Sequence, residues 1–272
     1  MTERENNIIH RVGDHLGEAT EHFPYDRIVG IFLQGSQNYG LDYEKSDVDT
    51  KLIVTPTFKD IAFNRKPIST THIRENEEHI DFKDIRLYIE TFRKQNLNFL
   101  EILFTDFKWV NQMYAEHWEQ LVKHREEIAH YNLYQAIKSM KGIAMEKYHA
   151  MEHPYPSKLA VLAEYGYDPK QLHHLLRVED YIKRYIAGEA YEDCLRPTNA
   201  DYLMAVKKGL YGLEDAREVG RESIERVTLM ADAFTEKVEN KGNPLVDDIL
   251  NDVQYNIMKI AIREEFNDPW KI

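Results

Sequence analysis

The sequence predicts an α/β (α+β) domain with a mixed sheet, followed by an all-α domain. Two observations carry this prediction. Short apolar runs of the length and period of strands fall almost entirely in the first part of the chain. After Trp109 they give way to apolar residues spaced three and four apart, the period of an amphipathic helix. We therefore divide the chain into a first domain over residues 1–110 and a helical domain over residues 111–272.

The elements of the first domain follow from this pattern in order. Apolar residues at helical spacing precede Phe23-Pro24, and an almost wholly apolar run ends at the turn Gly35-Ser36. A polar connection over residues 42–46 then leads into a second apolar run. The expected elements are a helix over residues 4–22, a strand over 28–33, a strand over 47–54, a hairpin of 70–74 with 78–83, a helix over 85–94, and a short helix or turn over 98–104.

The second domain is predicted to contain helices only. Prolines punctuate its middle, and the segment Lys241-Gly242-Asn243-Pro244 is a firm break before the last helix. The expected helices lie near residues 117–130, 132–151, 171–187, 199–211, 214–239 and 244–266.

The composition is that of a soluble globular protein. Of 272 residues, 43% are apolar and 30% are charged. No apolar run approaches the length of a membrane span, and the N-terminus lacks the features of a signal peptide, so we expect a cytoplasmic protein with no membrane partner. The single cysteine, Cys194, excludes an intrachain disulfide. The sequence leaves the oligomeric state open.

The formal charge of −12 argues against unspecific binding of long nucleic acid. A local basic groove is compatible with that total, and so is an ordinary solvated helix face. The basic residues concerned are Lys138, Lys141, Lys147, Lys158, Lys170, Arg177, Lys183 and Arg184.

Three carboxylates are candidates for a shared site. On a strand, Asp47 and Asp49 project from one face about 7 Å apart, while Val48 between them points to the other face. Asp81 lies between two apolar residues on the predicted hairpin, so its side chain should likewise point to the face opposite its neighbours. Carboxylates at this spacing suit a divalent cation that prefers oxygen ligands. The turn Gly35-Ser36 presents backbone donors that suit a phosphate.

These residues resemble the signature of the DNA polymerase beta nucleotidyltransferase superfamily, which has Gly-Ser, a spacer, Asp-x-Asp and a later Asp on another strand. The local sequence is similar to that of a bacterial and phage branch of predicted nucleotidyltransferases. The shared motifs are Gly-Ser-x-x-Tyr-Gly over residues 35–40 and Ser-Asp-x-Asp over 46–49. A second match spans residues 165–177, which resemble that branch's Tyr-Gly-Tyr-Asp-x-Lys-x-x-x-His-Leu-x-Arg. The resemblance therefore covers both halves of the chain and implies a nucleotidyltransferase fold.

The resemblance also implies roles for the residues. Asp47, Asp49 and Asp81 become catalytic metal ligands for Mg²⁺ or Mn²⁺, with Asp81 at the ion that binds the attacking hydroxyl. Gly35 and Ser36 become nucleotide-binding residues.

The second match adds a candidate cationic helix face. Lys170, His174 and Arg177 lie at steps of four and three and so share one face of a helix, whereas His173 falls off it. They are candidate nucleotide-binding residues, and Lys158 is a further one. The alternative is a plain helix start, because Asp168-Pro169 is a good cap and first-turn pair.

The predicted activity is transfer of a nucleoside monophosphate from an NTP, with ATP first among them, to a hydroxyl, with release of pyrophosphate. An RNA 3′ end, and a tRNA in particular, ranks narrowly first as acceptor, ahead of a protein or a small molecule. The alternative from another class is a catalytically silent nucleotide-binding or partner-binding module. A metal-dependent phosphohydrolase ranks last, because the sequence lacks the several His-Asp pairs that such enzymes carry.

Overall fold

The computed structural model describes residues 2–43 and 46–267, so positions 44 and 45 of the predicted polar connection lie outside the described part. Its centre is a five-stranded sheet in the order β3-β4-β2-β1-β5. β2 and β4 are parallel and the other neighbours are antiparallel, which confirms the mixed sheet. The strands are β1 Ile28–Gln34, β2 Asp49–Val54, β3 Ser69–Ile73, β4 His79–Asp84 and β5 Lys108–Val110.

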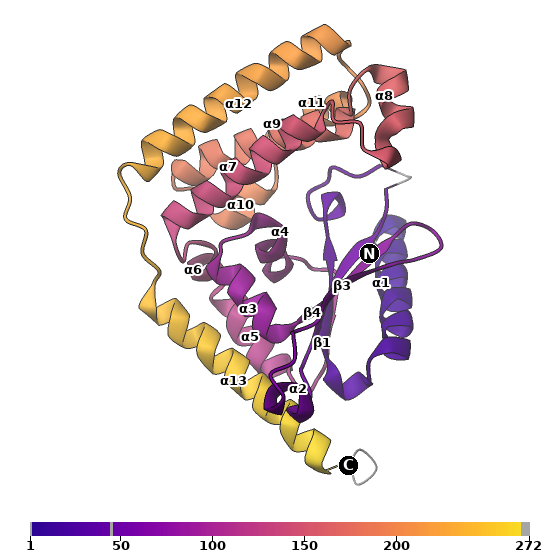
Figure 1. Cartoon of the computed structure of the whole chain (residues 1–272), viewed down its shortest axis with the longest axis vertical. Helices are drawn as coiled ribbons and strands as arrows, with labels where there is room; N and C mark the ends of the chain where they lie inside the picture. The colour runs from indigo at the N-terminus through magenta and orange to yellow at the C-terminus, as the bar shows by residue number, and fades with distance from the viewer. Residues whose placement is uncertain (1, 44–45, 268–272) are drawn as a thin grey trace.

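Helix α1, Glu3–His22, covers one face of this sheet (Figure 1). A capping box starts it, in which the Thr2 hydroxyl accepts from the Glu5 amide and the Glu5 carboxylate accepts from the Thr2 amide. Its apolar stripe packs on alternate side chains of β2 and β4, among them Leu52 and Phe82. The period of two in these strands therefore decides which side chains meet α1.

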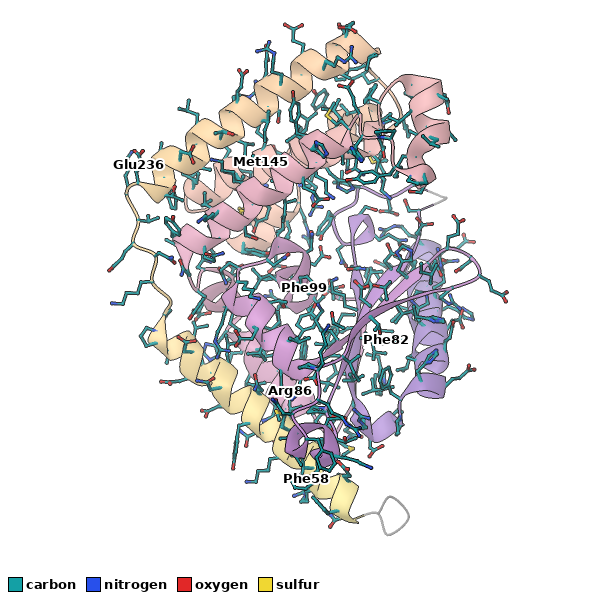
Figure 2. All side chains as sticks on the ribbon, viewed as in Figure 1. Phe58, Phe82, Arg86, Phe99, Met145 and Glu236 are labelled. Carbon is teal, nitrogen blue, oxygen red and sulfur yellow. The ribbon has the colours of Figure 1, made fainter. Side chains whose placement is uncertain are left out.

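The other face of the sheet meets the helices that follow it. Figure 2 shows Phe99 on this side and Phe82 on the side of α1. The short elements of the first half are η1 Tyr25–Arg27, η2 Ser36–Asn38, α2 Phe58–Ala62, α3 Ile85–Arg93, α4 Leu97–Leu100 and η3 Glu101–Leu103. The hairpin and the helix from residue 85 are where the sequence predicts them.

The rest of the described chain, apart from β5, is helical. Helix α9 packs against α7, α10, α11 and α12 (Figure 1). The remaining elements are α5 Ala115–Lys123, α6 Arg125–Ala129, α7 Leu133–Ala150, η4 Pro156–Lys158, α8 Leu159–Tyr165, α9 Pro169–Ile186, α10 Tyr191–Leu195, α11 Ala200–Lys207, α12 Leu213–Thr235 and α13 Pro244–Asn267. Each predicted helix has a counterpart, although α5 and α6 divide the one expected over residues 117–130.

The last helix, α13, returns to the first half of the chain. After α12 ends near Glu236, the chain runs along the outside, and α13 then lies beside α5 and α3 (Figures 1 and 2). Leu250 and Val253 are fully buried there, and the Arg93 guanidinium donates to Asp247 at 2.9 Å. The division at residue 110 stays a prediction, but the packing of α13 joins both sides of it. Within residues 2–43 and 46–267, every helix is too short or too polar to cross a membrane.

Candidate active site

The Gly-Ser turn directly follows β1. Gly35 has φ +89°, a conformation that only glycine adopts at no steric cost, and Ser36 then begins the single turn η2. No atom stands within 4 Å of a Cβ placed on Gly35, so its φ, rather than crowding, requires glycine. The Gly35 amide donates to the Glu101 carboxylate at 3.2 Å.

Asp49 and Asp81 project from the same face of the sheet. Their strands are parallel, and the register sets Lys51 opposite Asp81, two residues beyond Asp49. The His79 amide donates to the Asp49 carboxylate at 2.9 Å. Two of the three predicted metal ligands are therefore neighbours on the face that meets the helical half.

The third, Asp47, lies outside the strand. The prediction that β2 starts at Asp47 is wrong by two residues, because the ladder with β1 begins where Asp49 pairs with Gln34. The Asp47 carbonyl instead accepts from the Gln37 side chain at 2.9 Å. The alternation of exposed and buried side chains nevertheless continues before the start of β2, since Asp47 is exposed and Val48 is buried.

Asp81 has close partners on both of its carboxylate oxygens. The Lys51 ammonium lies 3.2 Å from one oxygen, and the Thr71 hydroxyl donates to the other at 2.6 Å. Burial alone would raise the pKa of Asp81, but the Lys51 charge and the Thr71 hydrogen bond outweigh it and leave that pKa below its usual value. Asp81 is thus held ionised and paired.

Asp49 is in the opposite electrostatic situation. Burial raises the pKa of its carboxyl group, and the nearby charge of Asp47 adds to that effect. The His79 amide and the charge of Lys170 oppose it without cancelling it. A cation bound here would favour the ionised form of both carboxylates.

The donor chemistry fits a hard divalent cation in part. Asp47 and Asp49 offer oxygen ligands, which Mg²⁺ and Mn²⁺ prefer. Asp81 fits only if a cation takes the place of the Lys51 ammonium. As the described side chains stand, no group of three or more His, Cys, Asp or Glu residues is disposed to hold a metal ion.

The predicted cationic face of α9 points toward the turn. The Arg177 guanidinium stacks 3.7 Å from the centre of the Tyr39 ring, and Tyr39 directly follows η2. Lys170, the second residue of α9, is exposed and lies within range of the Asp49 charge. Burial, and then the neighbouring charges of His173, Arg177 and Lys170, lower the pKa of His174. His173 packs elsewhere, with Nδ1 2.9 Å from the Leu203 carbonyl.

Lys158 has a different neighbour. Its ammonium lies 3.1 Å from the Asp168 carboxylate, which caps α9 by accepting from the Lys170 amide at 2.9 Å. The predicted cap is therefore present, and it gives Lys158 a role in holding the helix start. The helix-start interpretation and the cationic-face interpretation are both compatible with this geometry.

Sequence reasoning missed Lys207, which reaches the connection after the Gly-Ser turn. From the end of α11 its ammonium donates to the Leu41 carbonyl at 2.8 Å and lies 5.0 Å from the centre of the Tyr43 ring. Burial, and then the charge of Lys170, lowers the pKa of Lys207 to about 8, although Asp47 acts in the other direction. No motif marks this lysine, so the sequence carries no signal for it.

Glu101 is the other missed residue. Burial raises the pKa of its carboxyl group to about 7, while the charge of Arg177 and the Gly35 amide pull it back toward its ordinary value. A buried acid between a glycine turn and an arginine is a candidate functional group. Its sequence context, an apolar stretch over residues 99–104, predicts only a packed turn.

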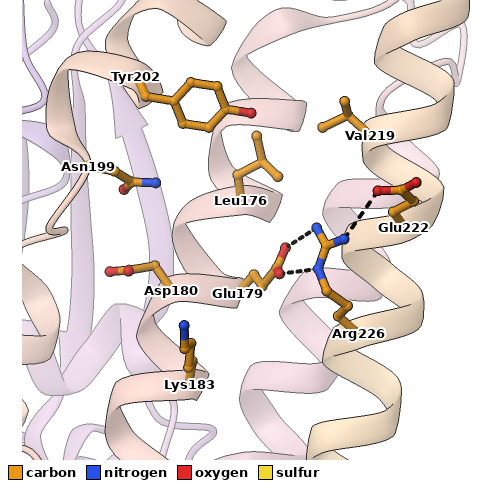
Figure 3. Close-up of a pocket in the computed structure, with 9 residues that line it drawn as sticks. All are labelled: Leu176, Glu179, Asp180, Lys183, Asn199, Tyr202, Val219, Glu222 and Arg226. Atoms are coloured by element: carbon orange, nitrogen blue, oxygen red, sulfur yellow. Dashed lines mark hydrogen bonds and ion pairs between the residues drawn. The ribbon is translucent and has the colours of Figure 1, made fainter.

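Thr71 and Asp81 line a cavity of about 210 Å³, and two further cavities lie beside α1 and in the helical half. One, of about 580 Å³, lies between α1 and the connection before Asp47, and Arg4, Arg11 and Ser46 are among its lining residues. The other, of about 360 Å³, lies among α9, α11 and α12, where Arg226 is bonded to Glu179 and Glu222 (Figure 3). None of the predicted site residues lines this second cavity.

Comparisons with known proteins add little to this geometry. No family model matches the chain, and no curated protein does. A nucleotidyltransferase-like protein from Exiguobacterium sibiricum is similar in structure, with 9% sequence identity over 95% of this chain and 80% of that one. The TM-score is 0.27, too low a similarity to support any inference about this chain.

Proposed function

We propose that this chain is a metal-dependent nucleotidyltransferase, which moves a nucleoside monophosphate from an NTP to a hydroxyl and releases pyrophosphate. One observation carries the proposal: Asp49 and Asp81 share a sheet face beside the Gly35 turn, opposite the Lys170 and Arg177 side of α9. Acids on one side and cations on the other suit a triphosphate carried with a divalent cation.

Each residue has a distinct part in this proposal. The turn after Gly35 presents backbone and hydroxyl donors to phosphate oxygens, and Lys170 and Lys207 balance their charge. Asp47 and Asp49 would hold Mg²⁺ or Mn²⁺. Asp81 would join them as a ligand once the cation takes the place of the Lys51 ammonium. When bound, such a cation neutralises phosphate charge and acidifies the attacking hydroxyl.

The nucleotide we place first is ATP, and the acceptor we place first is an RNA 3′ end, and tRNA in particular. The charges on the helical half support RNA only weakly. Of the eight basic residues that suggested a groove, four are paired with acids: Lys141 with Asp232, Lys147 with Glu146, Lys158 with Asp168, and Arg184 with Asp180 and Glu189. A protein or small-molecule hydroxyl therefore stays an alternative acceptor.

The test is incubation of the chain with each labelled NTP, Mg²⁺ or Mn²⁺, and either total RNA or total protein. We expect label in RNA, strongest with ATP, together with release of pyrophosphate. Label in protein would keep the activity and change the acceptor. Absence of pyrophosphate with every nucleotide and acceptor would contradict the proposal.

The pairing of Asp81 with Lys51 and Thr71 favours one alternative, a nucleotide-binding module that does not turn over. In such a module Lys51 would stand permanently where a cation is needed. It predicts nucleotide affinity with no pyrophosphate release under any condition. Calorimetric titration with a non-hydrolysable ATP analogue, alongside the pyrophosphate assay, distinguishes the two.

A further inference from the structure

Glu78 is a buried carboxylate just before β4, with only 1% of its side chain exposed. Its two oxygens face different groups. Oε1 accepts from the Val48 amide at 2.9 Å and contacts the Arg11 guanidinium. Oε2 lies 3.0 Å from Arg74 Nη1, 2.7 Å from Asn76 Nδ2 and 3.1 Å from His15 Nε2.

Val48 lies between Asp47 and Asp49 in the chain. Its amide precedes the first residue pair of the β1–β2 ladder. A buried amide without a strand partner needs another acceptor, and Glu78 supplies it. The next residue, His79, donates its own amide to Asp49. The segment of residues 47–49 is thus held by two consecutive residues: Glu78 through its carboxylate and His79 through its backbone amide.

Arg11 gives Glu78 a second effect on the same segment. Its guanidinium, from α1, contacts Glu78, and the charges of Asp47 and Asp49 also act on it. Without Glu78, Arg11 would still be attracted by those two carboxylates. An arginine there would compete with a bound cation for the same oxygens.

We propose that Glu78 is the positioning residue for the Asp47–Asp49 segment: it fixes the Val48 amide and holds Arg11 away from both carboxylates. Its effect on cation binding rests on the proposed function. Its effect on the Val48 amide does not, so the two are tested separately.

Glu78→Gln and Glu78→Met form a matched pair, since both remove the charge and only Gln keeps an acceptor for the Val48 amide. Burial lowers the pKa of His15 to about 4, so its ring is neutral at pH 7. A neutral His15 can accept from a glutamine NH₂ and donate its other N–H to Thr50, 2.8 Å away. With its oxygen toward Val48, Gln would keep that acceptor and its NH₂ would face His15. The donors Arg74 and Asn76, which bond to Oε2 in the wild type, would then have to turn to other acceptors.

Hydrogen exchange at the Val48 amide and calorimetric titration with Mn²⁺ are the two measurements. In Glu78→Met we expect exchange at Val48 to be about tenfold or more faster and Mn²⁺ affinity to fall by about 10- to 100-fold. In Glu78→Gln exchange at Val48 should stay within a few fold of the wild type, whereas Mn²⁺ affinity should fall, because the charge that pairs with Arg11 is gone. Should Glu78→Met fail to fold, Glu78→Asp keeps the charge for Arg11 but withdraws it from Val48. It is expected to speed exchange at Val48 as Met does and to lose less Mn²⁺ affinity than Glu78→Gln.

Asn76→Ala is the control, because it removes a donor from Oε2 and leaves Oε1 in place. It should lower the melting temperature without changing Val48 exchange or Mn²⁺ affinity. Wild-type exchange and affinity in Glu78→Met, or in Glu78→Asp if that is the variant that folds, would overturn the inference, as would equal losses in Asn76→Ala. A wild type that binds no Mn²⁺ would defeat the proposed function, while the exchange comparison would still decide the role of Glu78.

Discussion

Glu101 makes the stability of the protein depend on pH near neutrality. The folded state keeps a proton on this acid up to about pH 7, whereas the unfolded chain loses it near its ordinary pKa of 4.5. Between those values the folded state binds more protons, so stability falls as pH rises through this window. The total effect is about 3 kcal/mol.

Glu101→Gln removes that dependence, because an amide does not ionise and still accepts from the Gly35 amide. We expect the variant to gain stability relative to the wild type as pH rises from about 5 to 7, with a constant difference above that range. Urea unfolding at several pH values measures it. A stability difference that is flat from pH 5 to 7.5 would mean that Glu101 is ionised throughout.

Asp47→Asn and Asp49→Asn should each lower pyrophosphate release by on the order of a hundredfold or more, because each removes a carboxylate from the cation site. The melting temperature should hold, since Asp47 disfavours the charge on Asp49. Asp232→Asn, on the helical half, is the matched control and should keep full activity. Normal turnover in both site variants would refute their assignment.

Strand periodicity predicts the faces of the acidic side chains but not the pairing of Lys51 with Asp81. The two-residue period correctly put Asp49 and Asp81 on one face and Val48 on the other. The same period puts Lys51 on the face of Asp49, but it does not say which strand lies alongside. Only the parallel register with β4 brings Lys51 to Asp81, and no local propensity encodes that register.

At the scale of elements, substitution of the exposed Lys170 tests whether α9 binds the nucleotide. Lys170→Ala should weaken nucleotide binding several fold and flatten its dependence on salt, because one phosphate contact is lost. Lys183→Ala is the control, since it lies on the same helix but lines the cavity of Figure 3. We expect both variants to melt as the wild type does.

Titration with the ATP analogue at several salt concentrations compares the two variants. An equal loss in Lys183→Ala would indicate a diffuse charge effect, and no loss in Lys170→Ala would return α9 to a helix start alone. Arg177 is less informative, because its stacking on Tyr39 makes its removal a packing change as well.

Element length decides what the sequence could predict. The long helices α7, α9, α12 and α13 follow a sustained period and were predicted to within a few residues. The sequence does not predict strand β5 or helices α8 and α10, because each spans about two periods of its own kind or fewer. Such segments carry too few periods, and their form depends on partners such as β1, which pairs with β5.

At the scale of the whole molecule, one apolar core runs through both halves, from Val29 in β1 to Ala261 in α13. Leu250→Ala should therefore lower the free energy of unfolding by about 3 kcal/mol and destabilise sheet and helices together. Leu245→Ala, on the same helix but 62% exposed, is the control and should cost little.

Hydrogen exchange of amides in β1 and in α9, measured in both variants, shows whether the halves unfold as one. Equal acceleration in β1 and α9 is expected for Leu250→Ala. Acceleration confined to either half would mean that the halves unfold independently. The predicted boundary at residue 110 follows a real change of period, but periodicity cannot show that α13 comes back to pack on α3 and α5.

The return of α13 also sets an order of events on the ribosome. Residues 85–129, which include α3 and α5, emerge well before the helix that covers them begins at Pro244. At typical synthesis rates the interval is on the order of ten seconds. During that time the nascent chain displays the apolar surface that Leu250 and Val253 will later cover, so chaperone binding is expected to concentrate there until α13 leaves the exit tunnel.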